Sequence, residues 1–313
     1  MDGEWTTYMD MDCDCVGIDW GTTHRRLYAL GGRGEALWTL EDDDGVSSCR
    51  GRFEESLARG LQQLEVAPRR VVMSGMVGSA MGWQLVPYVD ASVALSDLPK
   101  RLVSLQTSTG TAPAWVVPGY CVRDAQGNPD VMRGEETQLL GAWAMGYTSG
   151  LFVLPGTHSK WVEVVNGKIV QLRTYMTGEL FSLLCKDGTL AAAAAGKEQL
   201  WDNAVFDQGV LAGQQGDLTG QLFGARARVV CSDMEACHVH ANISGLLIGS
   251  EFKDALSKVG ARHRSEPIRV LGASSLARHY EQAARLLGRA VEILEPNAAY
   301  VRGIAYIQQH GDF

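Results

Sequence analysis

The chain has 313 residues, and 28 basic against 36 acidic side chains give it a formal net charge of −8. This acidic balance argues against non-specific binding of nucleic acid, which needs a basic surface. It does not exclude small anionic ligands, because backbone N–H groups can bind phosphate whatever the net charge. Hydrophobic residues at 46% and charged residues at 20% exclude general disorder, and the length suggests one large or two medium domains.

The sequence shows no sign of a membrane or secretory segment. The run of alanines at residues 191–195 is far shorter than the roughly 20 apolar residues of a membrane-spanning helix. The first dozen residues are acidic and lack the apolar stretch of a secretory signal. The seven cysteines are odd in number and show no paired spacing, which indicates reduced thiols. We therefore expect a cytoplasmic protein without a nucleic-acid or membrane partner; a homodimer stays open.

One group of residues could suggest zinc. Cys231, Cys237, His238 and His240 lie close together in the sequence. Their spacing matches no usual set of zinc ligands, so we interpret the cluster as incidental.

The first half of the chain predicts an antiparallel meander followed by a helix and a strand. The apolar run at residues 16–18 ends at Asp19, a turn follows at 21–23, and two further strands at 26–30 and 35–40 flank a glycine turn. Residues 53–64 have apolar side chains at helical spacing, and the strand at 70–73 stops at Ser74-Gly75.

The second half repeats this plan. An apolar run at 151–154 precedes a turn at 155–158 and a hairpin whose Asn166-Gly167 pair is a strong turn signal. Gly156-Thr157 thus occupies the place that Gly21-Thr22 has in the first meander. Later, residues 269–274 resemble 70–76: a strand, then a glycine-serine turn into a helix. Helical patterns within 179–184, 203–212 and 239–259 fill an insertion in the second half.

The repeated plan predicts two α/β domains that face a cleft, with a boundary near Trp143 and Gly146. In each Gly-Thr turn, glycine lets backbone N–H groups approach a phosphate and threonine adds a hydroxyl. One turn from each domain could grip the β- and γ-phosphates of ATP. Asp19 precedes the first turn and could hold Mg²⁺ through water.

Other nucleotide-binding patterns are missing. The chain contains neither the P-loop sequence nor the dinucleotide fingerprint. The spacing of Gly245 and Gly249 instead indicates close packing between helices.

Six motifs closely resemble the 2-dehydro-3-deoxygalactonokinase family, over about residues 16–309. They stand at residues 19–23, 74–79, 131–138, 154–161, 176–180 and 244–249, and the longest read M-R-G-E-E-T-Q and P-G-T-H-S-K-W. The family belongs to the sugar kinase, Hsp70 and actin superfamily. The resemblance implies two actin-like (ribonuclease H-like) domains, with duplicated mixed sheets flanked by helices and a cleft between them. It also implies phosphorylation of the 6-hydroxyl of 2-dehydro-3-deoxy-D-galactonate by ATP with Mg²⁺, in galactonate degradation.

The resemblance assigns roles to each part of the chain. Residues 1–145 would carry the sugar side and the first phosphate loop; 146–313 would carry the second phosphate loop and the adenosine side, with the last helix packing back. The implied nucleotide-binding residues are Gly21, Thr22, Thr23, Gly156, Thr157, His158, Gly272, Ala273 and Ser274. The sequence departs from its relatives at His24, where asparagine is frequent, and at Ala273. Residues 191–237 match poorly and are treated as variable.

Related sugar kinases have a carboxylate shortly before the second phosphate loop that takes the proton of the attacking hydroxyl. Glu135 is the first candidate for this base and Glu136 the second, although acids also favour the first turn of a helix, which begins near Thr137, for electrostatic reasons. Asp19, as the Mg²⁺ holder, is the other catalytic candidate.

The six-carbon acid needs a cationic partner for its carboxylate, and either Arg26 or Arg133 could serve. The loop after the strand at 70–73 is the expected sugar side, because ligand sites gather at strand ends. Its candidate residues are Ser74, Gly75, Met76, Gly78 and Ser79, with Trp83 as one wall. The alternatives are a kinase for 2-dehydro-3-deoxygluconate, another sugar acid or a hexose, and an ATP-dependent binding protein of the same superfamily.

Overall fold

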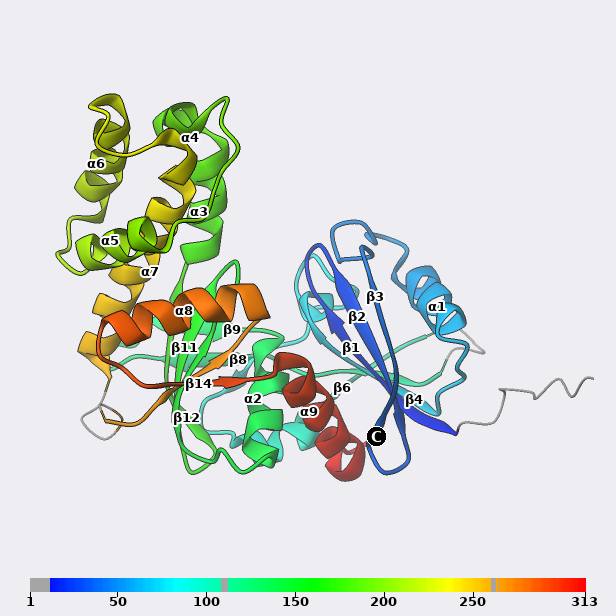
Figure 1. Ribbon diagram of the computed structural model, residues 1–313. Coiled ribbons are helices and arrows are strands. Elements are labelled where there is room, and N and C mark those ends of the chain that lie inside the picture. The colour runs from blue at the N-terminus through cyan, green and yellow to red at the C-terminus, as the bar shows by residue number, and fades with distance from the viewer. Residues whose placement is uncertain (1–11, 108–111, 260–262, 264) are drawn as a thin grey trace, which may run out of the picture. The chain divides into compact units, whose positions relative to one another are not determined.

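The computed structural model describes residues 12–107, 112–259, 263 and 265–313 (Figure 1). The expectation that no secretory signal is present depends on the N-terminal segment. Residues 1–11 of that segment lie outside the described part of the chain. The chain forms two compact units. The first contains residues up to Thr148 together with Asn166–Ile169 and Pro296–Phe313, and the second contains Ser149–Val165 and Val170–Glu295. Each unit is described by itself.

The first unit is built on a mixed sheet in the order β3-β2-β1-β4-β7-β6. Its strands are β1 (Cys13–Trp20), β2 (Arg25–Gly31), β3 (Ala36–Asp42), β4 (Arg70–Gly75), β6 (Val103–Leu105) and β7 (Ala114–Val116). The first three strands form the antiparallel meander that the sequence predicts, and β4 runs parallel to β1. Alternate residues of β1, Val16, Ile18 and Trp20, are fully buried in one core cluster, as the two-residue period of a strand requires.

Helices and a second, small sheet complete this unit. They are α1 (Phe53–Gln63), η1 (Met76–Gly78), η2 (Leu95–Arg101), α2 (Glu135–Ala144), α9 (Pro296–His310), β5 (Val89–Asp90), β8 (Tyr120–Arg123) and β9 (Pro129–Met132). One local expectation is wrong, because β4 leads into a single 3-10 turn rather than an α-helix. The helix expected near Thr137 is α2, which begins at Glu135 and has both acids in its first turn. Helices α2 and α9 lie side by side (Figure 1), and a Cβ on Gly141 of α2 would lie 1.7 Å from the carbonyl oxygen of Ala299 in α9.

The second unit has a mixed sheet in the order β12-β11-β10-β13-β14. Its strands are β10 (Gly150–Leu154), β11 (Ser159–Val165), β12 (Lys168–Tyr175), β13 (Ile268–Leu271) and β14 (Val291–Leu294). Strand β10 pairs antiparallel with β11 and parallel with β13, as β1 pairs with β2 and β4. The predicted duplication of mixed sheets flanked by helices is therefore confirmed.

The insertion of the second unit is helical. Its elements are α3 (Thr177–Lys186), α4 (Gly188–Ala194), α5 (Asn203–Gly213), α6 (Leu218–Val230), η3 (Ala236–His238) and α7 (Val239–Lys258), and α8 (Ser274–Leu286) follows β13. In Figure 1, α4 and α6 lie beside α3 and α7 at one end of this unit. The sequence predicts α3, α5, α7 and the start of α8; it does not predict α4 or α6. Aspartates cap two of these helices, since Asp202 accepts the N–H of Val205 and Asp217 accepts that of Gly220.

Glycines allow α5 and α7 to approach one another closely. A Cβ on Gly245 of α7 would lie 2.2 Å from the carbonyl oxygen of Phe206, and one on Gly249 would lie 2.2 Å from that of Val210. Gly209 of α5 in turn approaches the backbone of α7. The expected role of Gly245 and Gly249 in helix packing is confirmed.

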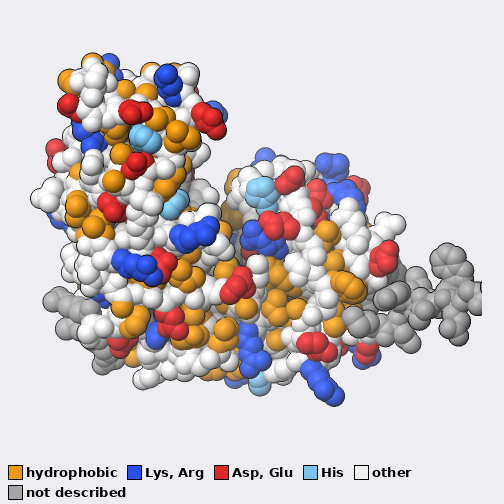
Figure 2. Space-filling model, in the orientation of Figure 1, with side chains coloured by type: hydrophobic (Ala, Val, Ile, Leu, Met, Phe, Trp, Pro, Cys, Tyr) orange, Lys and Arg blue, Asp and Glu red, His pale blue; other side chains and the backbone are white. Residues whose placement is uncertain are grey.

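Two further properties of the structure are the apolar character of its helices and the distribution of charged side chains on its surface. Among the described residues, no helix combines the length and the apolar character that a membrane crossing requires. On the face shown in Figure 2, basic and acidic side chains are interspersed rather than gathered into one basic patch. This distribution agrees with the net charge of −8.

We predict that Gly245→Ala lowers the free energy of unfolding by about 1–3 kcal/mol, because the added methyl group collides with the backbone of α5. Urea unfolding at neutral pH measures the change. Gly224→Ala is the matched control: Gly224 also lies within a helix, α6, but a Cβ there meets nothing within 4 Å. This control should be neutral or stabilising by about 0.5–1 kcal/mol. Equal stability of the two variants would contradict the packing argument.

Candidate functional site

The first Gly-Thr turn connects β1 to β2 and is fixed by backbone hydrogen bonds. The N–H of Gly21 donates to the carbonyl of His24 at 3.0 Å, and the N–H groups of Val46 and Ser47 donate to the carbonyls of Gly21 and Thr22, each at 3.0 Å. The side chains of Thr22 and Thr23 are exposed. The turn therefore has a fixed backbone and presents its hydroxyl groups on the surface.

The candidate magnesium ligand Asp19 lies near the end of β1, in register with Arg26 on β2 and with Ser74 on β4. The pKa of its carboxyl is raised to about 6, chiefly by burial; the positive charge of Arg26 opposes this rise, and the negative charges of Glu135 and Glu41 add to it. Asp19 and Glu135 are thus close enough to repel one another when both are ionised. The structure therefore brings together two of the acids that the sequence singles out.

The acid pair at the start of α2 is divided by burial. Glu136 is fully buried, its Oε2 accepts the N–H of Gly134 at 2.6 Å, and burial together with the charge of Glu135 raises its pKa to about 8. Glu135 is only half-buried, and its Oε2 accepts the N–H of Arg133 at 3.0 Å. The burial of Glu136 argues against it as a base for a bound substrate and leaves Glu135 as the candidate.

A close backbone contact links this acid pair to the loop after β4. Gly75 and Gly134 both have positive φ, at 90° and 109°. A Cβ on Gly134 would lie 3.2 Å from the Cα of Gly75. Glycine suits both positions because a side chain would strain the backbone there, and a side chain on Gly134 would also crowd Gly75 at the end of β4.

The expected sugar-side residues differ in accessibility. Ser74 is fully buried, and its hydroxyl lies 3.0 Å from that of Tyr300 in α9, so it supports the loop from inside. Gly75 and Gly78 are also buried, whereas Met76 and Ser79 are partly exposed.

Trp83 is partly exposed and stacks on Phe53, with ring centroids 6.2 Å apart and planes at 12°. It lines a pocket of about 500 Å³, together with Phe53, residues 50–52, 54–55 and 80–82. Of the candidate sugar-side residues, only Trp83 lines this pocket.

The two candidate arginines have different surroundings. Arg26 is partly exposed and forms an ion pair with Glu41 at 3.0 Å on the neighbouring strand. The guanidinium of Arg133 lies over the ring of Tyr88 at 4.3 Å and donates through Nη2 to the carbonyl of Val86 at 2.7 Å. Its Nε and Nη1 are buried without a hydrogen-bond acceptor among the described residues. Such buried donors cost free energy unless an acceptor reaches them.

In the second unit, the turn with Gly156 and Thr157 connects β10 to β11 and packs against the start of α3. The N–H of Glu179 donates to the carbonyl of Thr157 at 2.9 Å, and the Glu179 carboxylate pairs with the ring of His158. A Cβ on Gly178 would lie 2.3 Å from the carbonyl oxygen of Gly156. Thr157 and His158 are exposed. His158 is therefore held by Glu179.

The turn Gly272-Ala273-Ser274 lies at the same edge of the sheet. Strands β10 and β13 are parallel neighbours, so the turns that follow them emerge together, and a Cβ on Gly272 would lie 3.0 Å from Pro155. Gly272 is buried, while Ala273 and Ser274 are exposed at the start of α8.

An apolar pocket of about 170 Å³ adjoins these turns. It is lined by Gly156, Thr177, Gly178, Phe181, Trp201, Ser244, Leu247, Ile248, Ser275, Leu276, His279 and Tyr280. Trp201 and His279 stack face to face, with centroids 3.9 Å apart and planes at 7°. A flat aromatic wall in an apolar pocket suits a planar ring such as a nucleobase.

The sequence did not identify most of these lining residues. Trp201 lies in the segment 191–237, which matches the family motifs poorly, and its only sequence signal is that it directly precedes the helix cap Asp202. His279 is one of several polar residues on α8 and stands out only in the folded chain.

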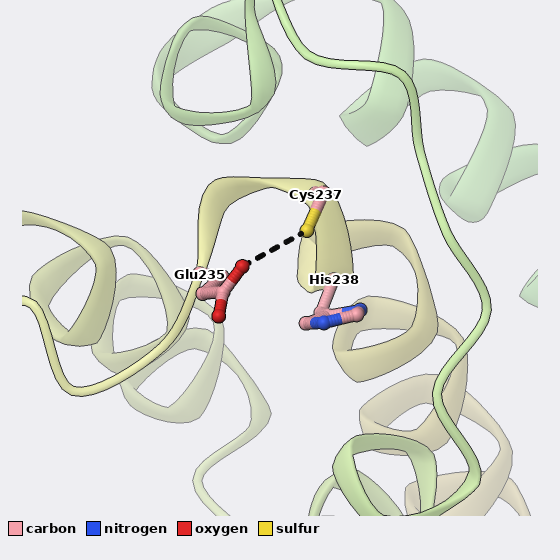
Figure 3. A group of neighbouring side chains, drawn as sticks. All are labelled: Glu235, Cys237 and His238. Carbon is pink, nitrogen blue, oxygen red and sulfur yellow. Dashed lines mark hydrogen bonds between the residues drawn. The ribbon is translucent and has the colours of Figure 1, made fainter.

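The residues that lie together in space differ from the cysteine and histidine cluster seen in the sequence. Figure 3 shows Glu235, Cys237 and His238, whose possible ligand atoms lie within 4.8 Å of one another; Cys231 and His240 do not belong to this group. The Cys237 thiol donates to Glu235 at 3.6 Å, and its pKa is raised by burial and by Glu235. With no ion bound these residues favour a protonated thiol, so a metal ion would have to displace that proton.

Comparisons with known proteins show which family this chain belongs to. The model of the 2-keto-3-deoxy-galactonokinase family matches residues 19–307. The chain is 34% identical over 294 residues to the 2-dehydro-3-deoxygalactonokinase of Escherichia coli (strain K12), which covers 93% of this chain and 96% of that protein. It also resembles the crystal structure of a candidate 2-dehydro-3-deoxygalactonokinase from Sinorhizobium meliloti, with a TM-score of 0.85, 30% identity, and 93% and 97% of the two chains covered.

A more distant similarity concerns the fold alone. Component A of (R)-2-hydroxyglutaryl-CoA dehydratase from Acidaminococcus fermentans aligns with a TM-score of 0.50 at 11% identity, over 94% of this chain and 97% of that one. The family match and the E. coli relative both span nearly the whole chain. The chain therefore belongs to the 2-keto-3-deoxy-galactonokinase family and is a carbohydrate kinase.

Proposed function

We propose that this chain transfers the γ-phosphoryl group of ATP to the 6-hydroxyl of 2-dehydro-3-deoxy-D-galactonate, in galactonate degradation. The observation that carries the proposal is the family match over residues 19–307, because this range includes both Gly-Thr turns and the acid pair. The seven cysteines are free thiols, which supports a reducing compartment such as the cytoplasm as the place of this reaction.

The nucleotide would use both Gly-Thr turns and the apolar pocket. We propose that Gly21, Thr22 and Thr23 in the first unit, and Gly156 and Thr157 in the second, bind phosphate oxygens of one ATP molecule. Exposed threonine hydroxyls in turns with a fixed backbone support this role. The adenine ring of ATP would enter the pocket beside Trp201. Gly272, Ala273 and Ser274 would lie on the adenosine side of the nucleotide.

The acids of the first unit fit a divalent cation. Desolvation is the main cause of the raised pKa of Asp19, and the negative charge of Glu135 adds to it, so a cation would stabilise the ionised carboxylate. We propose that Asp19 holds Mg²⁺, which would neutralise charge on the phosphates when bound. The carboxylate of Glu135 would accept the proton of the attacking 6-hydroxyl.

The substrate carboxylate would be bound by Arg133. Its Nε and Nη1 are donors without an acceptor among the described residues, whereas Arg26 already pairs with Glu41. Because both donor atoms are covered and Nη1 lies against Gly78, binding requires the segment between Gly78 and Tyr88 to move. The partly exposed Met76, Ser79 and Trp83 would then contact the sugar chain.

An assay of ADP release with a panel of acceptors tests the proposed substrate. We expect the highest kcat/KM with 2-dehydro-3-deoxygalactonate, a lower value with 2-dehydro-3-deoxygluconate and no turnover of glucose. Turnover of glucose or of the gluconate epimer that exceeds turnover of the galactonate acid would reject the proposed substrate. ATP hydrolysis that no sugar acid stimulates would instead support an ATP-dependent binding protein.

Glu135→Gln tests the proposed base. Since the amide cannot accept the proton, kcat should fall at least about 100-fold, while the Kd for ATP changes less than about threefold. Glu136→Gln is the matched control, because Glu136 is buried with a pKa of about 8 and is mostly neutral at pH 7; its kcat should stay within about threefold of wild type. Single-turnover kinetics measure both variants, and the reverse pattern would assign the base to Glu136.

Arg133→Gln tests the carboxylate partner. Removing the guanidinium should raise the KM for the sugar acid at least about tenfold, equivalent to about 1.4 kcal/mol, and leave the KM for ATP nearly unchanged. The control is Arg26→Gln, whose KM for the sugar acid should remain near that of wild type because Arg26 pairs with Glu41. Steady-state kinetics with each substrate varied in turn decide the point. A large KM increase in the Arg26 variant alone would transfer the role to Arg26.

A further inference from the structure

A single buried carboxylate in the second unit collects hydrogen bonds from four side chains. Glu251 lies on α7 and is 3% exposed. Its Oε1 accepts from Ser159 Oγ at 2.8 Å and from the indole N–H of Trp161 at 2.6 Å. The hydroxyl of Tyr280 lies 3.0 and 2.9 Å from the two oxygens, and Thr177 Oγ1 donates to Oε2. Four donors match the roughly four acceptor positions of an ionised carboxylate.

The donors come from the elements that carry the second Gly-Thr turn and the apolar pocket. Ser159 is the first residue of β11, directly after the turn, and Trp161 follows on the same strand. Thr177 is the first residue of α3, and Tyr280 belongs to α8. Burial raises the pKa of Glu251, and the hydrogen bonds from these side chains oppose that rise. The carboxylate thus connects three elements to α7.

The start of α3 in turn fixes the Gly-Thr turn. The N–H of Glu179 donates to the carbonyl of Thr157 at 2.9 Å, and Gly178 packs against the carbonyl of Gly156. Thr177 and Tyr280 also line the apolar pocket. A change in the hydrogen bonds of Glu251 would therefore shift the turn and the pocket wall together, although Glu251 itself does not line the pocket.

We propose that Glu251 is a positioning residue that holds the Gly156–His158 turn and the adjoining pocket in the arrangement that binds nucleotide. The proposal rests on the proposed nucleotide site of this unit. It also gives a physical reason for Ser159, Trp161 and Thr177, which lie in the motifs that carry the family resemblance but have no other assigned role.

Glu251→Gln tests this proposal, because the amide keeps the size of the side chain but replaces one acceptor oxygen by a donor. We expect the Kd for ADP, measured by calorimetry, and the KM for ATP to rise at least about tenfold. The KM for the sugar acid should stay within about twofold, and circular dichroism should report a folded protein. Ser159→Ala removes one donor and should raise the Kd for ADP about threefold; it decides the matter if Glu251→Gln does not fold.

Asp254→Asn is the matched control, since Asp254 also lies on α7 and bonds to Tyr175 and Lys258. Among the described residues it is not part of the pocket lining. Its Kd for ADP should stay within about twofold of wild type. A Glu251→Gln protein that melts at a lower temperature yet binds ADP normally would overturn the positioning role, as would an equal loss of affinity in Asp254→Asn. Failure of the wild-type protein to bind ADP would overturn the nucleotide site itself and this role with it.

Discussion

Parallel pairing of a central strand with one neighbour is the constraint on which each candidate site depends. In the first unit β1 runs beside β4, and in the second β10 runs beside β13. Because the carboxyl ends of parallel strands meet at one edge of a sheet, the turn after each central strand emerges next to the loop that follows its neighbour. Asp19 thus comes into register with Ser74, and Gly272 comes against Pro155. An antiparallel neighbour would have placed those loops at opposite edges.

Glycines allow the starts of two helices to approach the loops at this edge of each sheet closely. Gly134 approaches Gly75 and brings the start of α2, with Glu135, to the end of β4. In the second unit Gly178 approaches Gly156 and brings the start of α3 to the Gly-Thr turn. A side chain at either helix start would separate the backbones, so small residues here have a geometric cause. The two contacts lie at different places in the duplicated plan, because Gly75 ends β4 whereas Gly156 follows β10, the counterpart of β1.

Burial then distinguishes residues that look alike in the sequence. Glu135 and Glu136 are adjacent acids in one motif, yet the helix directs one side chain into the core and leaves the other half-exposed near Asp19. Arg26 and Arg133 are equal candidates by sequence, but Arg26 pairs with Glu41, whereas Nε and Nη1 of Arg133 have no acceptor within the described part of the chain. Ser74 lies in the expected sugar-side loop, but its hydroxyl is directed at Tyr300 inside the unit. None of these distinctions follows from local spacing, because each depends on residues distant in the chain.

The sequence by itself determined the strands of both meanders, the helices α1, α3, α5 and α7, and the family, because these features depend on local periodicity, turn chemistry and contiguous motifs. It also determined the close packing of Gly245 and Gly249, which follows from their spacing on one helix. Only the tertiary structure decided that Trp201 lines the apolar pocket and that four side chains meet on Glu251. These groups come from segments up to about 120 residues apart (Ser159 and Tyr280). A local sequence pattern does not show which of them are in contact, because such contacts form only when the folded elements pack together.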